Sequence, residues 1–168
     1  MRNLTKALAA PAIVSLTVTA APATASATPA TVNRCLPRHL TVTAQSAGAA
    51  AGTFGIHLTY TNTGPACTLR GYPGVSALGT TGRVLGSPAD RDPLYPVTTQ
   101  TLGRGGTAVS LLLLADVYNY PPGRCHYAKG AAFRVYPPGA SAADRAAYSF
   151  EGCRKPVVYM HTTAVTKS

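Results

Sequence analysis

The stretch TFGIHLTY, residues 53–60, alternates strictly between larger apolar side chains and small or polar ones. The apolar positions are Phe54, Ile56, Leu58 and Tyr60. Successive side chains of a β-strand point to opposite faces, so this period of two predicts a strand with one face in a core. Residues 40–45 alternate in the same way, and residues 62–65, Asn-Thr-Gly-Pro, then end the pattern with residues typical of turns.

Further short apolar segments separated by glycine and proline follow along the chain. We expect strands at 68–78 with a kink at 72–74, and at 83–85, 97–102, 107–117, 132–136, 147–150 and 157–161. Leu111 to Leu114 place apolar residues on both faces, which favours a strand covered on both sides, although a helix over 107–117 stays open. A short helix is possible at 140–147. The pattern predicts an all-β, immunoglobulin-like sandwich of about 7–9 antiparallel strands.

The sequence after residue 27 contains four cysteines, Cys35, Cys67, Cys125 and Cys153. In an exported chain, this even number indicates two disulfides. We favour Cys35 with Cys67 and Cys125 with Cys153, because each pair closes a segment of about thirty residues. The two crossed pairings stay open. The spacing contains no Cys-x-x-Cys, so neither a zinc knuckle nor a thioredoxin-like site is indicated.

The N-terminus has the pattern of a secretory signal peptide. Arg2 and Lys6 precede an uncharged, mostly apolar stretch at 7–21, and Ala25-Ser26-Ala27 offers small residues for cleavage. We predict a signal peptide at 1–27, a flexible lead at 28–34 and one domain at 35–168. The apolar stretch is shorter than the roughly 20 residues that a membrane helix needs, so we expect it to be removed with the signal peptide rather than to anchor the chain. No second long apolar run follows, so we expect no transmembrane segment in the mature chain.

The mature chain is strongly basic but sparsely charged. Residues 28–168 hold 13 Lys and Arg against 5 Asp and Glu, a net charge of +8. Such a field favours anionic partners, for example phosphate-bearing polymers of the cell wall. The arginines are dispersed, with no run of three, so composition or solubility explains the charge as well as binding does. Nucleic acid is not expected as a partner. A DNA affinity that falls steeply as salt rises would be the evidence for nucleic-acid binding.

A resemblance to a known family rests on two motifs. The first runs from Thr61-Asn62-Thr63-Gly64 to Cys67-Thr68-Leu69-Arg70-Gly71-Tyr72-Pro73-Gly74-Val75. The second is Phe133-Arg134-Val135-Tyr136-Pro137-Pro138-Gly139, between Cys125 and Cys153. Together they resemble the actinobacterial secreted family called domain of unknown function 4232. The resemblance implies an immunoglobulin-like sandwich at or outside the cell envelope and implies no activity; no lipid-acceptor cysteine is present at the cleavage point, unlike in many relatives.

The sequence predicts no catalytic residues, no metal site and no cofactor. Ser76 lies in Gly74-Val75-Ser76-Ala77-Leu78, which lacks the second glycine of a nucleophile elbow, and we expect it to face solvent. The four histidines, expected on polar faces, form no metal-binding pair in sequence: His39, His57, His126 and His161. Only five acidic residues exist, and Asp90 and Asp92 around Arg91 are typical of a turn.

One segment, residues 118–127, has the composition of a binding loop. The candidate binding residues are Tyr118, Tyr120, Arg124 and Tyr127. Tyrosine and arginine dominate binding hot spots, and Pro121-Pro122 beside Cys125 would keep the loop rigid before binding. The same residues would equally serve as ordinary stiffening of a connection between strands.

We therefore expect a non-enzymatic binding module that is secreted, either free or associated with the cell wall. Its partner would be extracellular or part of the envelope, and the basic charge favours an anionic one. The first alternative is a secreted protease inhibitor that inserts residues 118–124 into a protease cleft. The second is a secreted hydrolase whose site assembles only in space.

Overall fold

A computed structural model of the chain describes residues 32–168. The predicted signal peptide, residues 1–27, and residues 28–31 of the predicted lead lie outside this range. The described part is almost entirely β-structure. Its elements are η1 (Pro37–His39), β1 (Leu40–Ala50), β2 (Thr53–Asn62), β3 (Cys67–Arg70), β4 (Gly74–Gly79), β5 (Val84–Leu85), β6 (Asp90–Asp92), β7 (Thr99–Leu102), β8 (Thr107–Ala115), η2 (Val117–Asn119), α1 (Pro122–Cys125), β9 (Tyr127–Tyr136), β10 (Asp144–Cys153), β11 (Met160–Thr163) and β12 (Thr166–Lys167).

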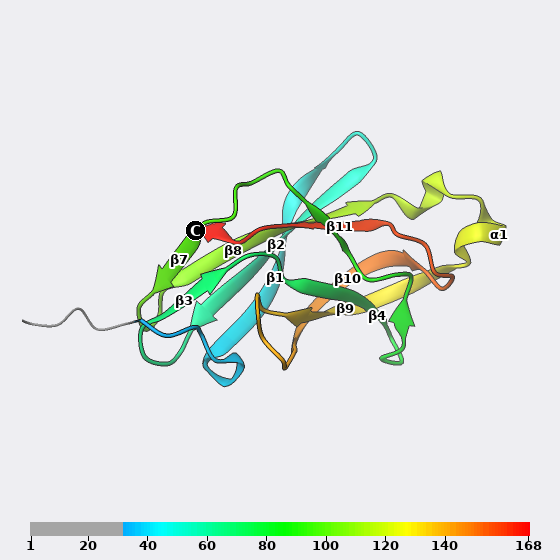
Figure 1. The fold of residues 1–168 in the computed structure, drawn as a ribbon. Coiled ribbons are helices and arrows are strands. Elements are labelled where there is room, and N and C mark those ends of the chain that lie inside the picture. Colours follow the sequence, from blue (N-terminus) through cyan, green and yellow to red (C-terminus); the bar gives the residue numbers. More distant parts are fainter. Residues whose placement is uncertain (1–31) are drawn as a thin grey trace, which may run out of the picture. The chain divides into compact units, whose positions relative to one another are not determined.

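Two main sheets form the layers of a sandwich (Figure 1). The larger sheet has the order β1-β2-β8-β11-β6, with β12 also paired to β8. The second sheet has the order β10-β9-β4-β5, and β3 and β7 form a small sheet of their own. As predicted, the domain is an all-β, immunoglobulin-like sandwich with two disulfides.

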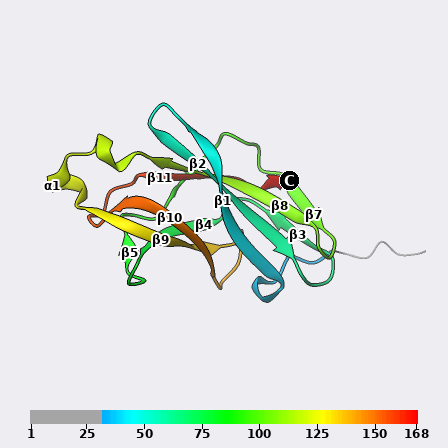
Figure 2. The same cartoon turned by 180° about the vertical axis from the view of Figure 1, so that it is seen from behind.

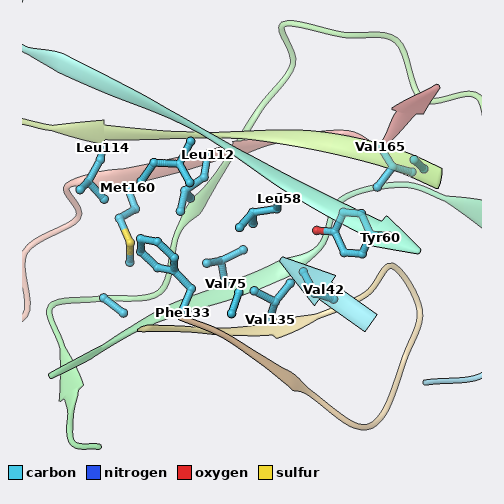
Figure 3. Close-up of a cluster of buried hydrophobic side chains, with 14 of the residues drawn as sticks. Val42, Leu58, Tyr60, Val75, Leu112, Leu114, Phe133, Val135, Met160 and Val165 are labelled. Atoms are coloured by element: carbon cyan, nitrogen blue, oxygen red, sulfur yellow. The ribbon is translucent and has the colours of Figure 1, made fainter. Parts of the chain in front are cut away.

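The core lies between the two main sheets (Figure 3). The alternation that defined residues 53–60 places Ile56, Leu58 and Tyr60 fully inside, while Phe54 is 45% exposed. The second sheet contributes Val75 from β4 and the residues Phe133 and Val135 of β9. Val42 of β1 also reaches β10, because its N–H donates to Asp144 Oδ2 at 2.7 Å.

A disulfide lies towards each end of the sandwich. Cys35–Cys67 ties the first described residues to β3, and Cys125–Cys153 ties α1 to the end of β10. In the two opposite views, α1 and the β3–β7 sheet lie at opposite ends (Figures 1 and 2). These are the pairings that the spacing favoured. Arg34 also forms an isolated bridge with Thr68 of β3.

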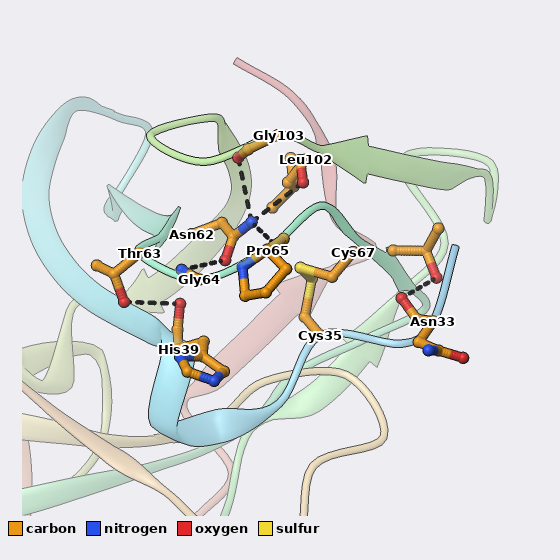
Figure 4. The surroundings of a disulfide bond; sticks show 11 residues. Asn33, Cys35, His39, Asn62, Thr63, Gly64, Pro65, Cys67, Leu102 and Gly103 are labelled. Atoms are coloured by element: carbon orange, nitrogen blue, oxygen red, sulfur yellow. Dashed lines mark hydrogen bonds between the residues drawn. A yellow bond between two sulfur atoms is a disulfide. The ribbon is translucent and has the colours of Figure 1, made fainter. Parts of the chain in front are cut away.

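Beside Cys35–Cys67, the buried Asn62 closes the turn after β2 (Figure 4). Its Nδ2 donates to three carbonyl oxygens, those of Pro65 at 2.9 Å and of Leu102 and Gly103 at 3.1 Å. Its Oδ1 accepts from the N–H of Gly64 at 2.9 Å. The Asn-Thr-Gly motif is therefore a structural device that joins the β2–β3 turn to the β7–β8 turn.

Several strand predictions hold, with shifted boundaries. The kink at 72–74 separates β3 from β4, and most of 107–117 is the strand β8 rather than a helix, with η2 beginning at Val117. The face of β8 that carries Leu112 and Leu114 is buried, but the opposite face is only half-buried. Residues 32–168 contain twelve strands, of which β5, β6 and β12 have only two or three residues.

Two local predictions are wrong. Residues 140–147 contain no helix; a turn covers 138–139, a bend covers 141–142, and β10 begins at Asp144, because pairing with β9 outweighs the helix preference of the alanines. Asp90 to Asp92 form the strand β6 rather than a turn. This strand pairs with β11 in parallel, whereas only antiparallel pairs were expected. Among the helices of residues 32–168, none has the length and apolar character that crossing a membrane requires.

Candidate functional site

Residues 118–127 contain most of η2, all of α1 and the first residue of β9. Asp116 caps the first turn, η2, because its Oδ1 accepts from the N–H of Tyr118 at 3.0 Å. The second turn, α1, begins after Pro121 and ends at His126, whose backbone is left-handed with φ of 51°. The segment predicted as a rigid loop is thus built from two short helical turns, of which η2 is capped by Asp116.

The structure brings the three predicted tyrosines together, but two of them hold the segment in place and the third is exposed. Tyr127 Oη donates to the carbonyl of Tyr120 at 2.6 Å, and Tyr120 Oη donates to that of Val158 at 3.2 Å. These two phenols hold the segment in place. Tyr118 packs edge-on against Tyr127, with ring centroids 4.9 Å apart, and is 62% exposed. Tyr118 is therefore the tyrosine of this group that offers a surface to a ligand.

Arg124, the fourth candidate binding residue, lies in α1. It is exposed in the last turn of α1, next to Cys125. Around it, the Arg154 N–H donates to the carbonyl of His126 at 2.9 Å and the Lys155 N–H to that of Cys125 at 3.1 Å. The disulfide and these bonds fix α1 to the end of β10.

A pocket of about 290 Å³ lies between the two main sheets beside η2. Its lining comes from both sheets and from the start of the candidate segment: Phe54 and Ile56 of β2, Leu114 and Ala115 of β8, Asp116, Val117 and Tyr118, and residues 148–151 of β10. Sequence reasoning missed this pocket. Its only signal was the partial overlap with residues 118–127, because strands far apart in the sequence supply most of the wall.

The wall on the β10 side depends on a glycine. Phe150 stacks on Phe133 with ring centroids 4.6 Å apart, and its ring occupies the space where a side chain at Gly130 would lie. The pairing of β9 with β10 also shifts register between Ala147 and Phe150. This bulge turns residues 148–151 into the pocket wall.

The pocket lining has a distinctive chemistry. Four aromatic residues contribute to it: Phe54, Tyr118, Tyr148 and Phe150. Asp116 and Glu151 are its charged residues, and no lysine, arginine or histidine belongs to the lining. An apolar floor and acidic residues therefore meet in one small cavity.

A second depression, of about 720 Å³, has the opposite charge. Arg83 follows the β4–β5 turn, Lys129 lies in β9 and Arg154 follows β10, and all three line it together with Thr80 and Thr81. The dispersed basic residues of the sequence are thus partly gathered by folding.

The residues considered for catalysis and metal binding lie apart. His57, His126 and His161 are exposed, and His39 is half-buried. Within residues 32–168, no three His, Cys, Asp or Glu side chains gather in a group that could hold a metal ion. Ser76, expected to face solvent, is buried, because β4 is a central strand and Arg134 lies directly opposite on β9.

Comparison with known proteins finds one relationship. No curated protein and no solved structure matches the chain. The family model described as domain of unknown function (DUF4232) matches residues 35–167, which contain both disulfides, the Asn62 turn and the pocket. The chain therefore belongs to the DUF4232 family.

Proposed function

We propose that this protein is a non-enzymatic binding module that works outside the cytoplasm and takes a small ligand into the pocket beside η2. The observation that carries the proposal is the position of this pocket. It opens beside Tyr118, in a segment already held by the cap at Asp116, two phenolic hydrogen bonds and the Cys125–Cys153 disulfide. A site that is ordered before binding loses little conformational entropy when the ligand enters.

The pocket dimensions support a small ligand. Pockets for drug-sized molecules span about 300–1,000 Å³, so a cavity of about 290 Å³ lies at the lower end. Its mostly apolar wall, built from Phe54, Ile56, Leu114 and Phe150, would cover the apolar part of such a molecule. A few polar residues at the wall would then fix its orientation.

The disulfides support export. Bonds of this kind persist in oxidising compartments and are rare in the cytosol. The signal-peptide pattern at residues 1–27 points the same way. The basic depression around Arg83, Lys129 and Arg154 supports contact with an anionic envelope polymer, and retention on such a polymer should fall as salt rises.

The two alternatives gain less support. A protease cleft accepts an extended peptide, but residues 117–119 and 122–125 form helical turns. A serine hydrolase needs a histidine beside its nucleophile, and Ser149, the serine of the pocket lining, has no histidine in that lining.

The test is whether small molecules enter this pocket. We would titrate the mature protein with a panel of neutral, anionic and cationic fragments and follow backbone amide resonances. We expect shifts at residues 54–56, 114–118 and 148–151. Phe54→Trp, which places a larger ring at the partly exposed rim of the pocket, should reduce them, whereas Ser141→Trp on the exposed turn should not. No saturable shift in the pocket from any fragment would refute the proposal.

A further inference from the structure

We propose that the ligand of this pocket is a small organic cation, an ammonium group on a short apolar stem; this inference rests on the proposed function. The first reason is charge. The chain has 15 Lys and Arg against 5 Asp and Glu, yet two of those five acids, Asp116 and Glu151, line the pocket and no basic residue does. The local charge is opposite to that of the molecule, so this cavity favours cations where the rest of the surface repels them.

The second reason is the density of aromatic rings. Phe54, Tyr118, Tyr148 and Phe150 come from three different elements and all line the cavity. The faces of aromatic rings attract cations, with energies of about 0.5–1 kcal/mol at exposed sites and more where water is excluded. Phe54 and Tyr118 are 45% and 62% exposed, although aromatic side chains of this size are usually covered. A cation would contact these rings and the apolar floor at once.

The third reason is that one acid, Asp116, is held at the cavity. Asp116 Oδ1 accepts from the N–H of Tyr118 at 3.0 Å, which fixes its carboxylate at the pocket. Glu151 lies in β10 directly opposite Lys129 of β9, so the two side chains share one face of the sheet. Asp116 is therefore the acid that would meet the ammonium group.

The experiment compares two probes of equal shape and different charge. Choline and 3,3-dimethylbutan-1-ol differ by the replacement of a quaternary nitrogen with a carbon. We would titrate each into the mature protein and fit the amide shifts of residues lining the pocket. We expect choline to bind about tenfold more tightly, the ratio that corresponds to about 1.4 kcal/mol.

The outcomes separate this inference from the proposed function. Equal binding of both probes, or tighter binding of the alcohol, would overturn the cation inference and leave the binding pocket in place. Failure of both probes and of the whole fragment panel to shift the pocket resonances would overturn both.

Charge-removing variants sharpen the test. Asp116→Asn keeps the capping oxygen, so it should weaken choline about threefold, in the range of exposed charge pairs, and leave the alcohol unchanged. Glu151→Gln, at a position opposite Lys129, should have a smaller effect. Asp92→Asn is the matched control, because Asp92 accepts from the Leu94 N–H at 2.9 Å in the same way but lies outside the pocket. Phe54→Leu should likewise weaken choline more than the alcohol. Equal effects on both probes would contradict the inference.

Discussion

At the residue scale, Asn62 shows how one side chain can join three parts of the chain. It is fully buried, and its amide forms hydrogen bonds with Pro65, Leu102, Gly103 and Gly64. A buried polar group is stabilising only when its partners are in place, and here both ends of the amide are used. The turn at 62–65 was predictable from its composition. The role of Asn62 was not, because two of its partners lie about forty residues away.

We predict that Asn62→Ala lowers the free energy of unfolding by about 2–4 kcal/mol, because three carbonyls, one of them in a buried hydrogen bond, lose their donor. Asn119→Ala, at an exposed position of η2, should change it by less than about 0.5 kcal/mol. Urea unfolding of both variants measures the difference. Similar small losses for the two would show that water replaces the amide at no cost.

At the element scale, the pair of strands β9 and β10 shapes the pocket. Glycine in a strand often marks a place where another group approaches closely, and the ring of Phe150 takes that space at Gly130. The register shift between Ala147 and Phe150 then directs residues 148–151 to the cavity. The sequence indicated β-structure at 132–136 and 147–150 but gave no sign of this bulge, which depends on how the two strands pair.

We predict that Gly130→Ala displaces the Phe150 ring, lowers the free energy of unfolding by about 1–3 kcal/mol and moves the amide resonances of residues 148–151. Adding Phe150→Leu should recover part of the lost stability by making room for the new methyl group. Gly103→Ala is the matched control, because nothing lies within 4 Å of its added carbon and its φ is not positive. An effect no larger than that of the control would contradict this account of the wall.

At the scale of the whole molecule, the two sheets bury two tyrosines completely. Tyr60 Oη bonds to Ser110 Oγ at 3.0 Å, and burial raises the pKa of Tyr60 well above its ordinary value near 10. Burial also raises the pKa of Tyr159 to about 12. Both groups stay protonated in the folded state over a range in which an unfolded chain would lose their protons.

We predict that the free energy of unfolding is insensitive to these tyrosines below pH 10 and falls between pH 10 and 12. Above pH 10 the unfolded state binds fewer protons, so each tyrosine lowers stability by about 1.4 kcal/mol per pH unit. Urea unfolding at a series of pH values measures the slope. The double variant Tyr60→Phe with Tyr159→Phe should flatten it, and Tyr95→Phe, at an exposed position, should not. An unchanged slope in the double variant would place the alkaline sensitivity elsewhere.

The sequence by itself determined the all-β class, the main strands and the two disulfides. These follow from local properties, namely side-chain alternation, turn composition and an even number of cysteines. The predictions from sequence were wrong at residues 140–147 and at Asp90 to Asp92, where pairing with another strand overrides the local preference.

Only the tertiary structure decided where a ligand could enter. The pocket needs Phe54, Leu114, Tyr118 and Phe150 from four separate elements, and the basic depression needs cations 71 positions apart, from Arg83 to Arg154. A cavity is the space left after strands have paired and sheets have packed. Its walls therefore depend on long-range register, which no local pattern in the sequence contains.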